Sequence, residues 1–180
     1  AYDLRRTTYE VLPTTNDRGP TTDFMIQTLE WTDQGVRFID QTKLPTEEIY
    51  VNCTTYQEVA DVIRNMVVRG APAIGVAAAM GLAIGVRKSA ATGTQKCATE
   101  FYKACEMMAA TRPTAVNLFW AIERMREFFS RLMAAGMPRE QAQARLVEES
   151  QRILEEDIAA CRAMGDYGAE LVPADQTVMT

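Results

Sequence analysis

The sequence predicts an α+β fold in which a small antiparallel sheet near the N-terminus is followed by a helical bundle. Three observations predict it. Short β-prone runs separated by turn signals occupy residues 24–53. Beyond residue 55, apolar residues recur at helical spacing, and proline stands near the start of several of these runs. The 47% hydrophobic content of the 180 residues is typical of a globular protein.

The sheet is expected to begin with a β-hairpin. Residues 24–31 and 36–40 are β-prone runs around a glycine turn at 32–35, and residues 47–53 are expected to add a third strand. So small a sheet needs helices packed against it for stability. Residues 1–22 are rich in Thr, Pro, Asp and Gly and are expected to form a loosely held N-terminal arm.

Helices are expected through the rest of the chain. Thr55 and Glu58 form a capping-box pattern before a helix over 59–68. Proline is expected to open three of the later helices, because its missing N–H has no partner at a helix start. These helices begin at Pro72, Pro113 and Pro138, an amphipathic helix covers 94–110 between them, and Gly136 is expected to end the helix that Pro113 opens.

The last helix is expected to be amphipathic. Its apolar face should carry Ala142, Leu146, Ile153, Ile158 and Cys161. Its solvated face should carry two ion pairs between residues four apart, Arg145 with Glu149 and Glu148 with Arg152. The aromatic residues of the preceding helix are expected to lie in the core: Phe119, Trp120, Phe128 and Phe129.

Composition excludes several classes of function. The net charge of −5 argues against a nucleic-acid or anionic-membrane surface. The absence of histidine removes histidine-based triads and most zinc sites, so we expect no metal site. The four cysteines form no CxxC pair and are expected to be free, mostly buried thiols of a cytoplasmic protein.

The segment "VVRGAPAIGV" points to an anion site. Arg69 and Gly70 directly precede a run that has no charged residue from Gly70 to Val86. We interpret this run as a buried central helix rather than a membrane helix, since its many small residues leave little bulk to face lipid. A helix start offers unpaired N–H groups and partial positive charge, and Arg69 can add a bidentate grip on phosphate. The alternative is a surface arginine paired with a carboxylate.

The same arrangement recurs in "TRPTAVNLFWAI". Arg112 precedes Pro113, which is expected to open a second apolar helix. Two arginines before two such helices predict that both bind one anionic ligand, although Arg112 is alternatively a surface residue near a helix cap. Asn117, one turn further on, either reaches a ligand hydroxyl or packs between helices.

The stretches "MVVRGAPAIGVAAAMG" and "TRPTAVNLFWAIERM" resemble the methylthioribose-1-phosphate isomerase family closely. "FIDQTKLP" is similar to its N-terminal sheet region, and "ILEEDIAACRAMGDYGAELVPADQTVMT" is similar to its interdomain stretch. The resemblance covers roughly residues 23–180 and leaves the arm unexplained.

The resemblance implies an aldose–ketose isomerase of methionine salvage. Members convert 5-methylthioribose 1-phosphate to 5-methylthioribulose 1-phosphate without cofactor or metal, generally as homodimers. The family's substrate-binding residues match Arg69, Gly70, Ala71 and Arg112.

The resemblance also implies a domain plan. The N-terminal domain corresponds to residues 23–172, and residues 173–180 are the linker and first strand of a Rossmann-like C-terminal domain. The family's catalytic cysteine and aspartate lie beyond the position of Thr180, so no catalytic residue is assigned here. We therefore expect the C-terminal half of the protein to accompany this chain.

Three alternatives remain from the sequence. One is a ribose-1,5-bisphosphate isomerase, a related sugar-phosphate enzyme. Another is a non-catalytic regulatory subunit of the translation initiation factor 2B type, which shares the fold. The third is a helical interaction module, which leaves the paired Arg–Pro segments unexplained.

Overall fold

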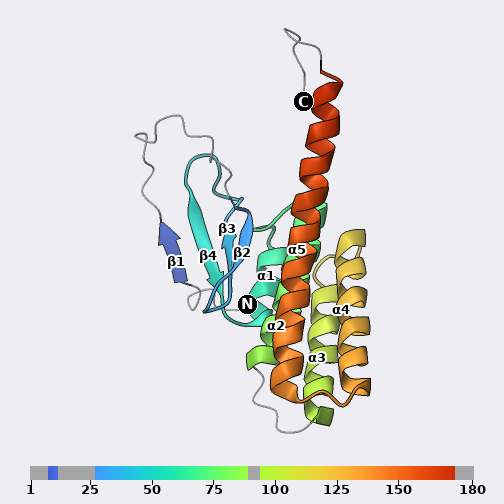
Figure 1. Cartoon of the computed structure of the whole chain (residues 1–180). Coiled ribbons are helices and arrows are strands. Elements are labelled where there is room, and N and C mark those ends of the chain that lie inside the picture. Colours follow the sequence, from blue (N-terminus) through green and yellow to red (C-terminus); the bar gives the residue numbers. More distant parts are fainter. Residues whose placement is uncertain (1–7, 12–26, 89–93, 173–180) are drawn as a thin grey trace.

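The computed structural model describes residues 8–11, 27–88 and 94–172. In this part of the chain, an antiparallel sheet lies beside a helical bundle, as predicted (Figure 1). The strands are β1 (Thr8–Val11), β2 (Leu29–Trp31), β3 (Val36–Ile39) and β4 (Ile49–Cys53). The helices are α1 (Tyr56–Arg64), α2 (Ala71–Lys88), α3 (Thr94–Ala109), α4 (Val116–Ala134) and α5 (Arg139–Glu170).

The predicted hairpin and third strand are confirmed. Strands β2 and β3 pair with Leu29 opposite Phe38, and β3 pairs with β4. The hairpin turn requires glycine, because a Cβ atom at Gly35 would lie 2.0 Å from the carbonyl oxygen of Cys53. Residues 24–26 of the expected first strand lie outside the described residues.

Strand β1 was not predicted from the sequence. Residues Thr8–Val11 lie within the expected arm, yet they pair antiparallel with β4 and complete the sheet order β1-β4-β3-β2. Three of its residues, Thr8, Tyr9 and Val11, are β-prone, but a run of four residues is too short to predict a strand within a Pro- and Thr-rich segment. The edge of β4 supplies their backbone hydrogen bonds, so only the tertiary pairing specifies this strand.

Helix α2 is the buried centre of the bundle, as the sequence predicted. Nearly every side chain from Ile74 to Val86 is buried, and α2 packs against the other four helices. The helix begins at Ala71, one residue before Pro72. No helix in the described ranges has the length and apolar character needed to cross a membrane.

The predicted ends of the neighbouring helices are partly confirmed. The capping box of α1 is present: the Glu58 N–H donates to Thr55 Oγ1, and the Thr55 N–H donates to the Glu58 carboxylate. Gly136 ends α4 with a φ of 65°, and the N–H groups of Gly136 and Met137 close a Schellman motif.

The predicted starts of α4 and α5 are each displaced. Residues 112–115 form a turn in which the Ala115 N–H donates to the Arg112 carbonyl, so α4 begins at Val116 rather than at Pro113. Pro138 is the residue before α5, not its first turn. The difference of one residue at Pro138 lies within the usual spread of helix boundaries, whereas the turn at 112–115 displaces the start of α4 by three residues.

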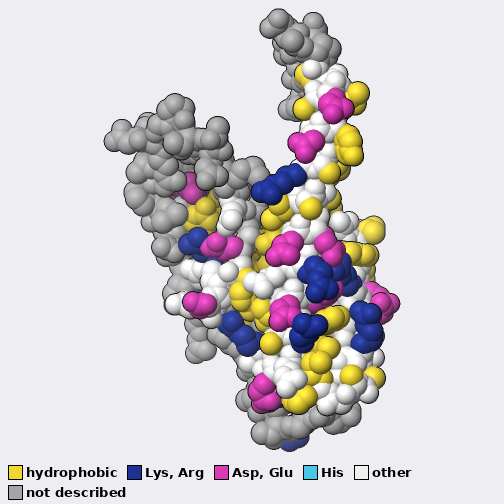
Figure 2. Space-filling model, viewed as in Figure 1, with side chains coloured by type: hydrophobic (Ala, Val, Ile, Leu, Met, Phe, Trp, Pro, Cys, Tyr) yellow, Lys and Arg dark blue, Asp and Glu magenta, His cyan; other side chains and the backbone are white. Residues whose placement is uncertain are grey.

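The apolar face predicted for α5 is buried only as far as Ile153. Beyond it the helix extends past the bundle (Figures 1 and 2). Ile158 and Cys161, in this extension, are exposed. The predicted ion pairs are also wrong. Arg145 pairs with Glu148, and Glu149 is buried and pairs with Arg152.

Two further expectations concern aromatic and cysteine side chains. Phe129 is buried and stacks on Phe101 with ring centroids 4.1 Å apart, whereas Phe119 and Trp120 are exposed. The prediction of a core position is therefore wrong for those two, and Phe128 is partly buried against the core. All four cysteines are free thiols, and three of them are buried, as expected: Cys53, Cys97 and Cys105.

Candidate functional site

The segment between α1 and α2 presents Arg69 and Gly70. It leaves α1 through Met66, which has a φ of 59°, and the Val67 N–H donates to the Val62 carbonyl. Gly70 has a φ of 102°, which a residue with a Cβ atom rarely adopts. The backbone that leads into α2 therefore requires glycine at this position. The absence of a side chain also leaves the N-terminus of α2 accessible to a ligand.

Arg69 is held by the loop that follows β3. Its Nη2 donates to the Gln41 carbonyl at 2.7 Å, and the Gln41 N–H donates to the Val67 carbonyl at 3.0 Å. The loop is fixed in turn by the buried Asp40 carboxylate, which accepts hydrogen bonds from the backbone and hydroxyl of Thr42. The "FIDQ" segment thus positions the exposed Arg69 guanidinium, whose remaining N–H groups have no hydrogen-bond partner among the described residues.

The first turns of α2 and α4 have no side chain that would compete with an anion for their backbone N–H groups. Neither has an acidic side chain, and Ala115 before α4 makes no side-chain cap. Helix α1, by contrast, is capped by Thr55 and Glu58. A helix start without a cap keeps its N–H groups and its positive end available to an anion.

A cleft of about 450 Å³ joins these two helix starts to the middle of α5. Its lining residues are Pro72, Gly75 and Val76 of α2, Val116, Asn117 and Trp120 of α4, and Ile153, Glu156 and Asp157 of α5. The helices approach so closely that a Cβ atom at Gly75 would lie 2.8 Å from the Asn117 carbonyl oxygen. The structure therefore brings the two helix starts together.

The predicted site residues lie at the rim of this arrangement. Arg69, Gly70 and Ala71 are exposed at the start of α2, and Arg112 is half-buried in the turn before α4. None of them lines the cleft itself, and no described contact joins the two arginines. That these residues bind a substrate stays a prediction.

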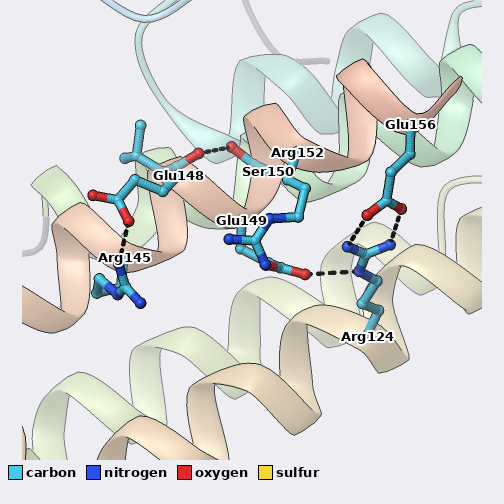
Figure 3. A network of polar contacts seen from close by, with 8 residues as sticks. Arg124, Arg145, Glu148, Glu149, Ser150, Arg152 and Glu156 are labelled. Carbon is cyan, nitrogen blue, oxygen red and sulfur yellow. Dashed lines mark hydrogen bonds and ion pairs between the residues drawn. The ribbon is translucent and has the colours of Figure 1, made fainter. Parts of the chain in front are cut away.

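Arg124 lies at the centre of a network of ion pairs between α4 and α5 (Figure 3). It contacts two residues that line the cleft, Trp120 and Glu156. Its Nε donates to Glu149 at 2.7 Å, and both of its terminal nitrogens donate to the Glu156 carboxylate, one of them at 2.9 Å. The guanidinium also lies over the Trp120 ring, 5.5 Å from the centroid. Arg152 completes the network with a 2.9 Å bond to Glu149.

These contacts favour the charged forms of Arg124 and Glu156. The hydrogen bond to Glu156 raises the pKa of Arg124 further above its ordinary value. The hydrogen bond from Arg124 lowers the pKa of Glu156. Trp120 and Glu156 are therefore held in place by one fixed ion-pair network, rather than by independent surface contacts.

Sequence reasoning missed the cleft residues of α5 and the role of Trp120. Glu156 and Asp157 fall in the run "LEEDIAA", where nothing distinguishes them from a solvated helix face. Asp157 also lines a second cleft of about 770 Å³ between β2, α2 and α5. In the ranges 8–11, 27–88 and 94–172, no group of Cys, Asp and Glu side chains is arranged to hold a metal ion.

This arrangement of sheet and helices is that of a known family. Residues 67–180 match the initiation factor 2 subunit family, and the chain belongs to it. Within that family, the chain is 54% identical over 159 residues to a methylthioribose-1-phosphate isomerase of Koribacter versatilis. It is 50% identical over 154 residues to the enzyme of the same name from Trichlorobacter lovleyi.

Two solved structures resemble this chain in fold as well as in sequence. The crystal structure of 5-methylthioribose 1-phosphate isomerase from Pyrococcus horikoshii superposes with a TM-score of 0.78 at 38% identity over 83% of this chain. Translation initiation factor eIF-2B subunit delta from A. fulgidus superposes at 0.74, with 37% identity over 84% of this chain. The chain matches 42% and 43% of these two chains, and spans 44% of the length of the two isomerases above. It thus corresponds to their N-terminal portion.

Proposed function

We propose that the protein to which this chain belongs converts 5-methylthioribose 1-phosphate to 5-methylthioribulose 1-phosphate, and that this chain supplies the substrate-binding half. One observation carries the proposal. Two helix starts without an acidic residue in the first turn, each preceded by an arginine, meet at one cleft. The relatives named as isomerases of this sugar phosphate, at 54% and 50% identity, supply the substrate class.

The reaction explains why anion binding matters. The C1 oxygen of the substrate carries the phosphate, so the sugar cannot open to a free aldehyde. The ring must open with C1 still phosphorylated, and hydrogen must move from C2 to C1. Arg69 and Arg112 hold the phosphate with the N–H groups of Ala71 and the α4 start, which fixes the sugar for the catalytic groups.

The resemblance assigns the remaining properties. A cysteine and an aspartate in the C-terminal half carry the proton transfers, in a pocket from which water is excluded. The enzyme uses no cofactor and no metal, and it works in the cytoplasm as a homodimer. Its N-terminal domain extends over residues 23–172, and the segment 173–180, outside the described residues, leads into the Rossmann-like domain.

Substitution of the two arginines tests the proposal. In the full-length protein, Arg69→Ala and Arg112→Ala should each weaken binding of methylthioribose 1-phosphate by about 10- to 150-fold, the effect of losing one charge-assisted hydrogen bond. Titration calorimetry measures this loss. Arg145→Ala is the control, because that exposed arginine pairs with Glu148 on the surface of α5 and does not line the cleft. Losses below twofold for both site variants would refute the proposal.

The second candidate is a regulatory subunit, which the likeness to the eIF-2B subunit favours. The greater identity to the isomerases weighs against it. A turnover assay on the full-length protein distinguishes the two candidates. An isomerase forms the ketose from methylthioribose 1-phosphate, whereas a regulatory subunit does not.

A further inference from the structure

We propose that the cleft between α2, α4 and α5 receives the uncharged, apolar group at C5 of the substrate and rejects a phosphate at that position. The inference rests on the proposed function. Such a cleft distinguishes methylthioribose 1-phosphate from ribose 1,5-bisphosphate, because the two sugars differ only in the substituent at C5.

The walls of the cleft suit a thioether. Most of its lining residues are apolar, and two of them present their side chains openly: Val116 is 79% exposed and Trp120 is 50% exposed. Exposed apolar surface inside a concave site gains from contact with an apolar ligand group. A thioether sulfur also makes favourable contacts with an aromatic ring, which Trp120 supplies.

The cleft lies next to the proposed phosphate site. Pro72 and Val116 belong to the first turns of α2 and α4 and line the cleft, while Arg69 and Arg112 precede the same turns. In Figure 1 both helices begin at the end of the bundle toward which α5 runs. A phosphate bound at these helix starts therefore places the opposite end of its sugar at the mouth of the cleft.

The charges of the cleft disfavour a second phosphate. No lysine or arginine is among its lining residues, and the Glu156 charge is neutralised by Arg124. Asp157 is half-buried and has no ion pair or hydrogen bond with any described residue. Its unpaired negative charge would repel a C5 phosphate without opposing a neutral methylthio group.

Arg124 is a positioning residue for this cleft. It acts through Trp120, which it covers, and through Glu156, which it binds with two nitrogens. Because Arg124 is hydrogen-bonded to the buried Glu149 as well as to Glu156, turning its guanidinium toward an incoming phosphate would break both contacts. Among the described residues, the network thus leaves no cation on this side of the cleft to attract a C5 phosphate.

The test compares the two substrates on the full-length protein. The wild type should show a much larger kcat/KM for methylthioribose 1-phosphate than for ribose 1,5-bisphosphate. Asp157→Asn should shift the ratio of the two kcat/KM values toward the bisphosphate by about tenfold, because one nearby unit charge is removed. Val116→Lys places a cation at the exposed edge of the cleft and should shift the ratio in the same direction while lowering kcat/KM for the methylthio sugar.

Glu155→Gln is the matched control. Glu155 is exposed on the same helix and lines neither cleft, so its loss should leave the ratio within about twofold of wild type. Circular dichroism confirms that each variant is folded. An unchanged ratio in folded Asp157→Asn and Val116→Lys would overturn the inference while leaving the proposed function intact. A wild-type protein that turns over neither sugar would instead refute the proposed function.

Discussion

Arg124→Ala is expected to destabilise the protein more than any other single change at an ion pair of the described helices. The side chain joins α4 to α5 through three hydrogen bonds to two carboxylates. One of these, Glu149, has a side chain that is only 5% exposed. Removing Arg124 therefore leaves a buried carboxylate with one partner, Arg152.

The expected loss is about 3 kcal/mol. Breaking a buried pair costs about 3–5 kcal/mol when the remaining charge has no partner. Arg152 stays 2.9 Å from Glu149, which brings the cost of that contact down to about 2 kcal/mol. The exposed pair with Glu156 and the contact with the Trp120 ring add about 0.5 kcal/mol each.

Urea unfolding followed by circular dichroism measures the change as a lower midpoint at an unchanged slope. Arg126→Ala is the matched control on the same helix, since Arg126 and Glu123 are 3.9 Å apart and both about half exposed. It should cost no more than about 1 kcal/mol, because its ion pair is exposed and its only other described contact is with the Tyr102 ring. If Arg124→Ala costs no more than Arg126→Ala, the network does not stabilise the bundle and the reasoning fails.

Three further predictions follow from the same structure. The folded-state pKa of Glu156 lies below its ordinary value of 4.5, so its pairing with Arg124 stabilises the fold above pH 4.5, and this contribution is lost as the pH falls through the folded-state pKa. The loss of unfolding free energy caused by Arg124→Ala, measured by urea unfolding, should therefore be smaller at pH 3 than at pH 7. Gly75→Ala should destabilise the protein by about 1–3 kcal/mol, because the new Cβ would press on the α4 backbone. Gly165→Ala, which has open space around it, should stabilise α5 by up to about 1 kcal/mol, and thermal unfolding compares the two variants. Among the four cysteines of this chain, Ellman's reagent should modify Cys161 rapidly and only slowly the cysteines whose pKa burial raises: Cys53, Cys97 and Cys105, the last to about 12. Peptide mapping of the modified protein assigns each thiol, and rapid modification of Cys53, Cys97 or Cys105 would contradict the described burial.

The sequence by itself determined the features that depend on local chemistry. The capping box of Thr55 and Glu58, the hairpin around Gly35 and the stop at Gly136 each involve residues within a few positions of one another. The apolar run of α2 could bury itself only at the centre of a bundle, whatever its neighbours. An arginine next to the start of an apolar helix is likewise a local pattern, so neighbouring residues alone were enough to predict the candidate anion site.

Only the tertiary structure decided the features that depend on residues far apart in the chain. Strand β1 exists because β4 offers an edge, and Glu149 is buried because Arg124 of α4 meets it there. The cleft itself is made by three helices, and its lining residues run from Pro72 to Asp157, more than 80 positions along the sequence. Helical periodicity tells which residues share a face, but not which neighbour covers that face, and so the sequence left Trp120 and Asp157 indistinguishable from ordinary core and surface residues.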